Sequence, residues 1–121
     1  MIYRPRRTML YVPNHVPQFI EKAKSLEADS IIFDLQESVP PEFKQKAREN
    51  LAEYLTDSSG FGHSEKIVRI NSLETQWGLD DLKLLKELDI DAILLPRVES
   101  AAELMNAIKS IDDHRDDELT I

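Results

Sequence analysis

Polar side chains of the kinds used in catalysis follow two of the short apolar segments in this chain. Residues Ser30–Lys44 read SIIFDLQESVPPEFK, so an apolar run ends in Asp34, and Gln36 and Glu37 come directly after it. A later run, KIVRIN, ends around Arg69. Carboxylates orient substrates or move protons, and a guanidinium binds a carboxylate through two parallel hydrogen bonds. The ends of these two runs are therefore the first candidates for a functional site.

Side-chain alternation predicts toward which face of the sheet the polar groups at the ends of these two runs point. Successive side chains of a strand point to opposite faces, so Asp34 lies on one face and Phe33 and Leu35 lie on the other. By the same rule, Arg69 and Asn71 share a face of the later strand. A charge on the inner face of a fold is costly unless it is paired. The pattern leaves two interpretations open: a structural ion pair between Asp34 and Arg69, or an Arg69 guanidinium presented to a substrate carboxylate.

Strands and helices alternate in the predicted elements that position these residues. Short apolar runs typical of strands buried on both faces are Thr8–Val12, Ile31–Leu35, Ile67–Ile70 and Ala92–Leu95. Apolar residues at helical spacing predict helices within 16–26, 43–55, 79–85 and 101–111. Ser100 and Glu103 form a capping-box pattern at the start of the last helix. The final residues, ELTI, have the composition of a fifth strand beginning.

This order predicts an α/β fold, for which two architectures compete. A doubly wound sheet usually carries a glycine-rich turn after its first strand, and none of the three glycines of this chain lies there. A (β/α)8 TIM barrel places its chemistry at the carboxyl ends of its strands and needs about 250 residues. We therefore expect residues 1–121 to form the first four βα units of a single barrel domain, a half barrel that is truncated.

Composition excludes several classes of partner and site. The formal net charge of −8 argues against nucleic acid or an anionic membrane as the main partner. The absence of cysteine excludes a disulfide framework and a thiolate metal site. No apolar run approaches the ~20 residues of a membrane span. We expect a cytoplasmic protein, with the mitochondrial matrix as the alternative.

Four sequence stretches occur in order across nearly the whole chain: RRTMLYVP, IIFDLQESVPPEFKQKAREN, IVRINSLETQWGLDDL and ILLPRVESAAEL. Together they resemble the CitE-like branch of the HpcH/HpaI aldolase/citrate lyase β-subunit family. The resemblance implies an oligomeric (β/α)8 barrel that binds Mg²⁺. It also implies cleavage or formation of a carbon–carbon bond beside a carbonyl, in a 3-hydroxy-acyl-CoA such as citryl-CoA or malyl-CoA. In such chemistry the metal holds the keto-acid partner and stabilises enolate charge.

The resemblance also implies roles for individual residues. Arg69, in the family's VRxN motif, would bind a substrate carboxylate or the thioester oxygen. Asp34 and Glu37 would act with it as catalytic residues that orient the substrate or support the metal. Arg7, at the family's RR start, and Arg97, in LPRVES, would be further substrate-binding residues.

Two departures from the family pattern bear on these roles. The family's Asp-Leu-Glu-Asp reads Asp-Leu-Gln-Glu here, so Gln36 replaces a glutamate and cannot act as a base, whereas Glu37 keeps a carboxylate on a longer arm. The resemblance places the magnesium ligands on later strands, beyond Ile121, so no residue of this chain is assigned as a ligand. Glu99 lies beside a capping serine, and we give it a structural role in preference to a metal-binding one.

Two functions of different classes follow. In the first, the chain is part of a Mg²⁺-dependent carbon–carbon lyase or aldolase and is inactive alone. Its partners would be an acyl-CoA or keto-acid substrate and further copies of itself. In the second, the chain is a non-catalytic half barrel that associates with itself or with a second-half chain through exposed strand edges.

Overall fold

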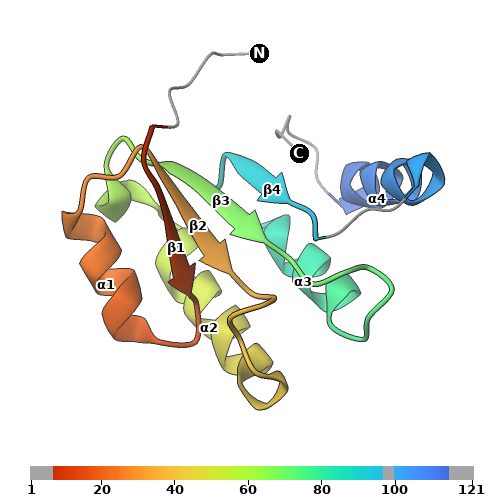
Figure 1. Ribbon diagram of the computed structural model, residues 1–121, viewed down its shortest axis with the longest axis horizontal. Helices are drawn as coiled ribbons and strands as arrows, with labels where there is room; N and C mark the ends of the chain where they lie inside the picture. Colours follow the sequence, from red (N-terminus) through yellow and green to blue (C-terminus); the bar gives the residue numbers. More distant parts are fainter. Residues whose placement is uncertain (1–6, 97–99, 115–121) are drawn as a thin grey trace.

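Parallel strands and helices alternate along the chain in the computed structural model, which describes residues 7–96 and 100–114 (Figure 1). The strands are β1 (Met9–Pro13), β2 (Ser30–Asp34), β3 (Glu65–Arg69) and β4 (Ala92–Leu94). The α-helices are α1 (Pro17–Ser25), α2 (Lys44–Leu55), α3 (Gly78–Leu85) and α4 (Ala101–His114), and the 3-10 turns are η1 (Pro41–Phe43) and η2 (Ser59–Phe61). The sheet order is β1-β2-β3-β4, and every neighbouring pair is parallel. The predicted α/β class is therefore confirmed.

The main hydrophobic core lies between the sheet and the helices behind it in Figure 1. It contains Val12, Ile20, Ala23, Ile31, Phe33, Leu35, Ala47, Leu51, Leu55, Val68, Ile70, Leu82, Leu85 and Ile93. Phe33 of β2 meets Phe61 of η2 edge to face, with ring centroids 5.2 Å apart. Each fully buried Val, Leu, Ile or Phe side chain of this core contributes roughly 1.5–3 kcal/mol to folding. The core therefore fixes which face of each strand turns toward the helices.

The opposite face of the sheet carries a smaller apolar cluster and the polar residues of interest. Ile32, Ile67 and Ala92 are adjacent in the parallel register and are buried together. Asp34 and Arg69 are the next residues on this same face, two positions after Ile32 in β2 and after Ile67 in β3. The predicted orientation of Asp34, away from Phe33 and the helices, is thereby confirmed.

Local sequence signals set the ends of the helices. Pro17 is the first residue of α1, where its missing N–H needs no partner. The Ser100 hydroxyl oxygen accepts a hydrogen bond from the Glu103 N–H at 3.1 Å, which confirms the serine half of the predicted capping box. A Cβ on Gly78, the first residue of α3, would lie 2.1 Å from the Ser72 carbonyl oxygen. Only glycine allows the chain to enter α3 at this angle.

Two strands begin earlier than the apolar runs predict. β2 starts at Ser30 and β3 at Glu65, and both residues are buried. They are register partners, and the Ser30 hydroxyl donates a 3.0 Å hydrogen bond to the Glu65 carboxylate. Cross-strand pairing of polar groups thus extends the ladder where the sequence lacks apolar residues. The predicted fifth strand, ELTI, lies outside the described residues.

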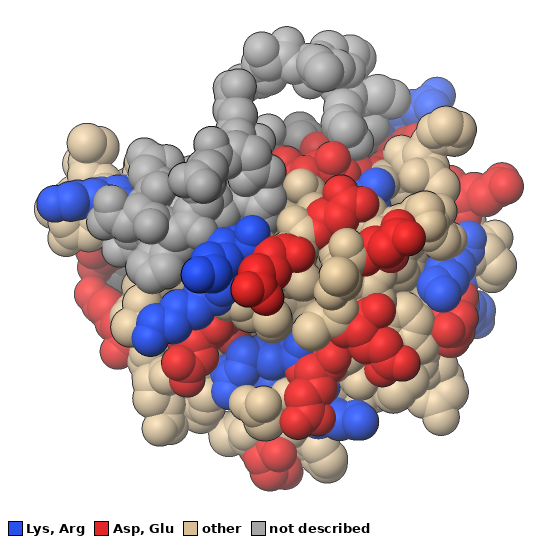
Figure 2. Space-filling view, turned by 180° about the vertical axis from the view of Figure 1, so that it is seen from behind, with Lys and Arg blue, Asp and Glu red and all other residues tan. Residues whose placement is uncertain are grey.

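The outer face of the helical layer is charged. Figure 2, seen from behind the sheet of Figure 1, shows basic and acidic side chains interspersed over this face. No helix in the described part of the chain is long and apolar enough to cross a membrane.

Candidate active site

An ion pair joins the carboxyl ends of β2 and β3. Asp34 and Arg69 are the last residues of these strands and are register partners. The Arg69 Nε and Nη2 atoms donate hydrogen bonds to the two Asp34 oxygens, at 2.9 and 2.7 Å. The parallel ladder therefore brings together the two residues that the sequence singled out, in a side-on bidentate arrangement.

Asp34 is held by more donors than Arg69 alone. Its Oδ1 accepts the Gln36 N–H at 2.8 Å, and its Oδ2 accepts the Ser38 N–H at 2.9 Å and the Ser38 hydroxyl at 2.6 Å. Burial by itself raises the pKa of Asp34. The hydrogen bonds from Arg69, Ser38 and Gln36 outweigh burial, so the pKa is held well below its usual range. A carboxylate this weakly basic is poorly suited to accept a proton, so the geometry favours an orienting role.

One nitrogen of Arg69 makes no hydrogen bond to the described part of the chain, on the face of the sheet that is turned away from the main core. Within the described residues, Nη1 donates no hydrogen bond. The Glu37 carboxylate, on a side chain that is 78% exposed, is 3.7 Å away, beyond hydrogen-bonding distance. The hydrogen bond with Asp34 is the main cause that raises the pKa of Arg69, against the opposing effect of burial. The guanidinium therefore stays charged, hydrogen-bonded to Asp34 through Nε and Nη2 and ion-paired with Glu37 at Nη1.

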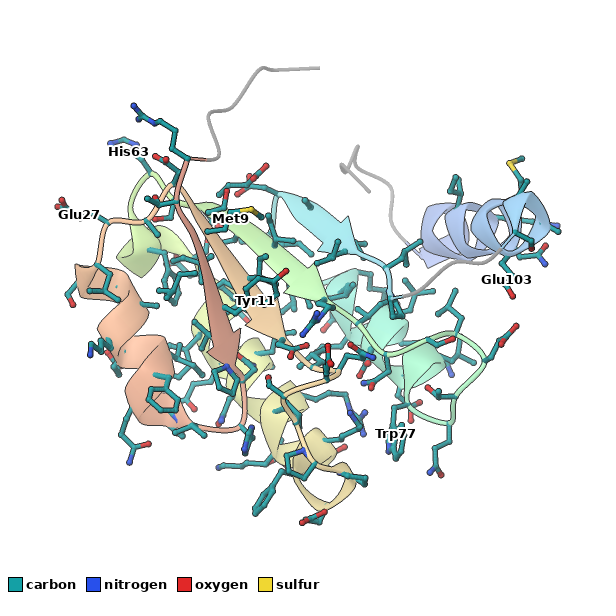
Figure 3. All side chains as sticks on the ribbon, in the orientation of Figure 1. Met9, Tyr11, Glu27, His63, Trp77 and Glu103 are labelled. Atoms are coloured by element: carbon teal, nitrogen blue, oxygen red, sulfur yellow. The ribbon has the colours of Figure 1, made fainter. Side chains whose placement is uncertain are left out.

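Tyr11 joins this site although its sequence context did not identify it. Its ring centroid is 5.1 Å from the Arg69 guanidinium carbon, a cation–π contact. Tyr11 is 52% exposed, and Figure 3 shows it over the face of the sheet that is turned away from the helices. Alternation within β1 predicts which residues share its face, but only the register between strands shows that Tyr11 reaches Arg69.

Asn71 does not join the site, contrary to the alternation prediction. β3 ends at Arg69, and the Asn71 side chain turns back to donate to the Leu35 carbonyl oxygen at 2.9 Å and to Asp81 of α3 at 2.6 Å. Asp81 also accepts a 3.2 Å hydrogen bond from Arg48. Burial raises the pKa of Asp81 in spite of these bonds. This network ties the end of β3 to the helical layer and commits the Asn71 amide to Leu35 and Asp81.

The remaining predicted substrate-binding residues lie elsewhere. Arg7 precedes β1 and pairs with Asp29 at 3.5 Å, at the amino ends of the strands. The structure therefore does not bring Arg7 together with Arg69, because the length of the sheet separates them. Its role in substrate binding stays an untested prediction. Arg97 and Glu99 lie outside the described residues.

The described residues offer no magnesium site of their own. No group of three or more His, Cys, Asp or Glu residues among them is placed to hold a metal ion. Asp34, the acid closest to Arg69, has both oxygens committed to hydrogen bonds. Residues 7–96 and 100–114 therefore do not fit the ion by themselves, and ligands beyond Ile121 stay a prediction.

A parallel strand–helix repeat with polar side chains at the carboxyl ends of its strands has the layout of part of a TIM-barrel-type α/β fold. Residues 7–119 match the family model of HpcH/HpaI aldolase/citrate lyase. The chain belongs to this family.

Individual relatives agree with this assignment. The chain is 43% identical over 100 residues to a (3S)-malyl-CoA thioesterase of Cereibacter sphaeroides, and this matched region covers 83% of this chain and 35% of the relative. It is 41% identical over 108 residues to the citrate lyase subunit beta of Leuconostoc mesenteroides, covering 89% of this chain and 35% of the relative.

A solved structure shows the same fold. The citrate lyase beta subunit of M. tuberculosis, complexed with oxaloacetate and magnesium, has a TM-score of 0.68 and 30% identity, covering 84% of this chain and 44% of that one. The chain spans about a third of the length of the curated relatives, 35% in both cases above. It corresponds to the N-terminal part of those proteins.

Proposed function

We propose that this chain supplies the carboxylate-binding arginine of a Mg²⁺-dependent carbon–carbon lyase or aldolase that acts on a 3-hydroxy-acyl-CoA, such as citryl-CoA or malyl-CoA. The observation that carries the proposal is the side-on pairing of Arg69 with Asp34, which orients the guanidinium and leaves Nη1 without a hydrogen bond within residues 7–96 and 100–114, with only the exposed Glu37 carboxylate of these residues facing it. Two relatives are named for a malyl-CoA and a citrate reaction, and the structure of another holds oxaloacetate and magnesium.

In this proposal each residue of the site has a distinct role. Arg69 binds a substrate carboxylate or the thioester oxygen through Nη1 and the unused hydrogen of Nη2. Asp34 fixes the guanidinium and does not exchange protons with the substrate. Glu37 is the exposed carboxylate beside Nη1, so it orients the incoming group or is displaced by it. Magnesium belongs to the same proposal, with ligands from outside this chain.

Anion binding tests this role directly. Acetate added to the ¹⁵N-labelled chain is expected to shift the Arg69 side-chain signals. Arg69→Lys, which keeps the charge but loses the planar fork, is expected to weaken acetate binding about tenfold, the equivalent of one charge-assisted hydrogen bond. Acetate binding that is unaffected by this substitution would exclude Arg69 as the carboxylate ligand.

The chain alone is expected to lack lyase turnover, because the acids that would hold the metal are absent from its described residues. Citryl-CoA or malyl-CoA is incubated with the chain and Mg²⁺, and release of the CoA product and keto acid is followed. Clear turnover by residues 1–121 would contradict this part of the proposal.

A second candidate function is association without catalysis, as a half barrel that pairs with another copy or with a second-half chain. Met9 and Tyr11 support it, because they lie on the outer strand β1 and are 48% and 52% exposed. Large exposed side chains on an outer strand favour pairing with a further strand. Size-exclusion chromatography with light scattering is expected to show an oligomer, and a clean monomer at high concentration would count against it.

A further inference from the structure

A buried lysine lies behind the loop that follows β2, and the proposed reaction gives it no role. The Lys44 ammonium donates hydrogen bonds to the carbonyl oxygens of Leu35 and Gln36, at 3.1 and 3.0 Å. Lys44 is only 5% exposed, and its ammonium lies 4.9 Å from the centroid of the Trp77 ring, labelled in Figure 3. Burial lowers the pKa of Lys44, while nearby carboxylates oppose this effect.

The place of Lys44 in α2 is unfavourable for a cation. It is the first residue of this helix, where the positive end of the helix dipole repels an ammonium. Burying an ammonium is also costly unless its hydrogens are bonded. Helix stability therefore does not explain a lysine here. The two loop carbonyls that it holds do explain it.

The loop of residues 35–38 is held from two sides. On one side, Lys44 binds the carbonyl oxygens of residues 35 and 36, which also accept hydrogen bonds from the Asn71 side chain at 2.9 Å and the Val39 N–H at 3.3 Å, respectively. On the other side, the N–H groups of Gln36 and Ser38 donate to the Asp34 carboxylate, at 2.8 and 2.9 Å. The same two Asp34 oxygens receive Arg69. A loop conformation that satisfies Lys44 is thus the one that also directs the amides at Asp34.

We infer that Lys44 is a positioning residue for Arg69. By holding the carbonyls of loop 35–38, Lys44 keeps the loop amides on Asp34, and Asp34 in turn fixes the guanidinium. Without the ammonium, the loop turns its amides away, Asp34 loses donors, and the side-on pairing with Arg69 loosens. The consequence for anion binding rests on the proposed function, whereas the consequence for the Arg69–Asp34 pairing does not.

The Arg69 Nε–H signal in ¹H–¹⁵N spectra of the full chain reports this pairing without any ligand. The signal is assigned by its loss in Arg69→Lys. In Lys44→Met it is expected to move toward the position of a solvent-exposed arginine or to broaden through exchange with water. Acetate affinity is expected to fall about tenfold, because one charge-assisted contact loses its orientation.

Lys24→Met is the matched control. The Lys24 ammonium also lies over an aromatic ring, 5.0 Å from the Tyr54 centroid, but it belongs to the last turn of α1, next to the amino ends of the strands. Removing it deletes a lysine, its cation–π contacts with Tyr54 and Phe61 and its ion pair with Glu21, without touching loop 35–38. The Arg69 Nε–H signal and acetate affinity are both expected to stay at their wild-type values.

Chemical rescue provides a second variant. The chain contains no cysteine, so Lys44→Cys introduces a single thiol, which 2-bromoethylamine alkylates in denaturant to a lysine analogue with a restored ammonium. After refolding, the alkylated protein is expected to regain the wild-type Arg69 signal. Lys44→Gln, which keeps one donor to the loop, is expected to show an intermediate signal if Lys44→Met does not fold.

The outcomes separate the two claims. An unchanged Arg69 Nε–H signal in folded Lys44→Met, or in Lys44→Gln, would overturn the positioning role. Weaker acetate binding with that signal unchanged would also overturn it, because the loss would then reflect only the removed charge. A wild-type chain that binds no acetate would refute the proposed function, while the Nε–H comparison would still decide the role of Lys44.

Discussion

Replacing Asp34 with asparagine is expected to destabilise the protein severely. The substitution keeps the size of the side chain but removes the charge that faces Arg69. It also replaces one acceptor oxygen by an NH₂ group. That NH₂ must face either Arg69 and Gln36 or Arg69 and Ser38, because both oxygens of Asp34 accept hydrogen bonds. Donor then faces donor, and the asparagine cannot relax by flipping its amide.

The magnitude follows from burial. Asp34 is 1% exposed, and the Arg69 side chain is 17% exposed, so solvent screens this pair weakly. Removing one partner of a buried ion pair costs about 3–5 kcal/mol, because the other charge is left buried without compensation. Domains of this size unfold with about 5–15 kcal/mol, so the loss is a large part of the total stability.

Urea unfolding followed by circular dichroism measures this loss, with Asp91→Asn as the control. Asp91 pairs with Lys66 at 3.6 Å near the amino end of β3, and its side chain is 26% exposed. We expect the control to lose about 1 kcal/mol, the range of partly exposed pairs. A loss below about 1 kcal/mol for Asp34→Asn would refute the claim that the carboxylate charge holds this site together.

Three further predictions rest on single measurements. The folded-state pKa of Asp34 is depressed, so the stability that its carboxylate contributes is fully present above the unfolded pKa near 4 and is lost as the pH falls toward the folded pKa. Urea midpoints of the wild type should therefore decrease from about pH 4 downward, and those of Asp34→Asn should decrease less. Gly78→Ala should lower stability by several kcal/mol or prevent folding, because its Cβ would lie 2.1 Å from the Ser72 oxygen. Thermal melts of both variants measure this, and Gly60→Ala should be tolerated, because its Cβ would lie 3.4 Å from the nearest atom, in the Lys24 side chain. Tyr11→Leu should leave the fold intact and cost about 0.5–1 kcal/mol in chemical denaturation, the strength of an exposed cation–π contact, and an unchanged midpoint would show that the contact contributes nothing.

The fold was predictable from the sequence because most residues of each strand are apolar and buried, so the strands stand out as short apolar runs. Runs of apolar residues located all four strands, and helical spacing located the helices that cover them. The strand boundaries were less predictable where a polar pair extends the ladder. Ser30 and Glu65 have the composition of loop residues, and only their mutual hydrogen bond in a buried register places them inside strands.

The site was predictable within a strand and not between strands. Alternation placed Asp34 and Arg69 on one face, because the two-residue period holds as long as the strand lasts. It failed for Asn71, since β3 ends at Arg69 and the period ends with it. It could not find Tyr11 beside Arg69, because register depends on the packing of the whole sheet. A lysine at a helix start, as at Lys44, has the sequence pattern of a solvated residue.

The geometry also bears on the two interpretations that the sequence left open for Asp34 and Arg69, and we propose that it favours an orienting role for Asp34. A buried ion pair contributes little net stability when its attraction only offsets the desolvation of two charges. Here Asp34 accepts five hydrogen bonds, two from the guanidinium and three from residues 36 and 38. Arg69, in contrast, leaves Nη1 without a hydrogen bond to any described residue. This asymmetry is expected when the carboxylate serves to orient the arginine, and the open nitrogen is where an anionic substrate would complete the site.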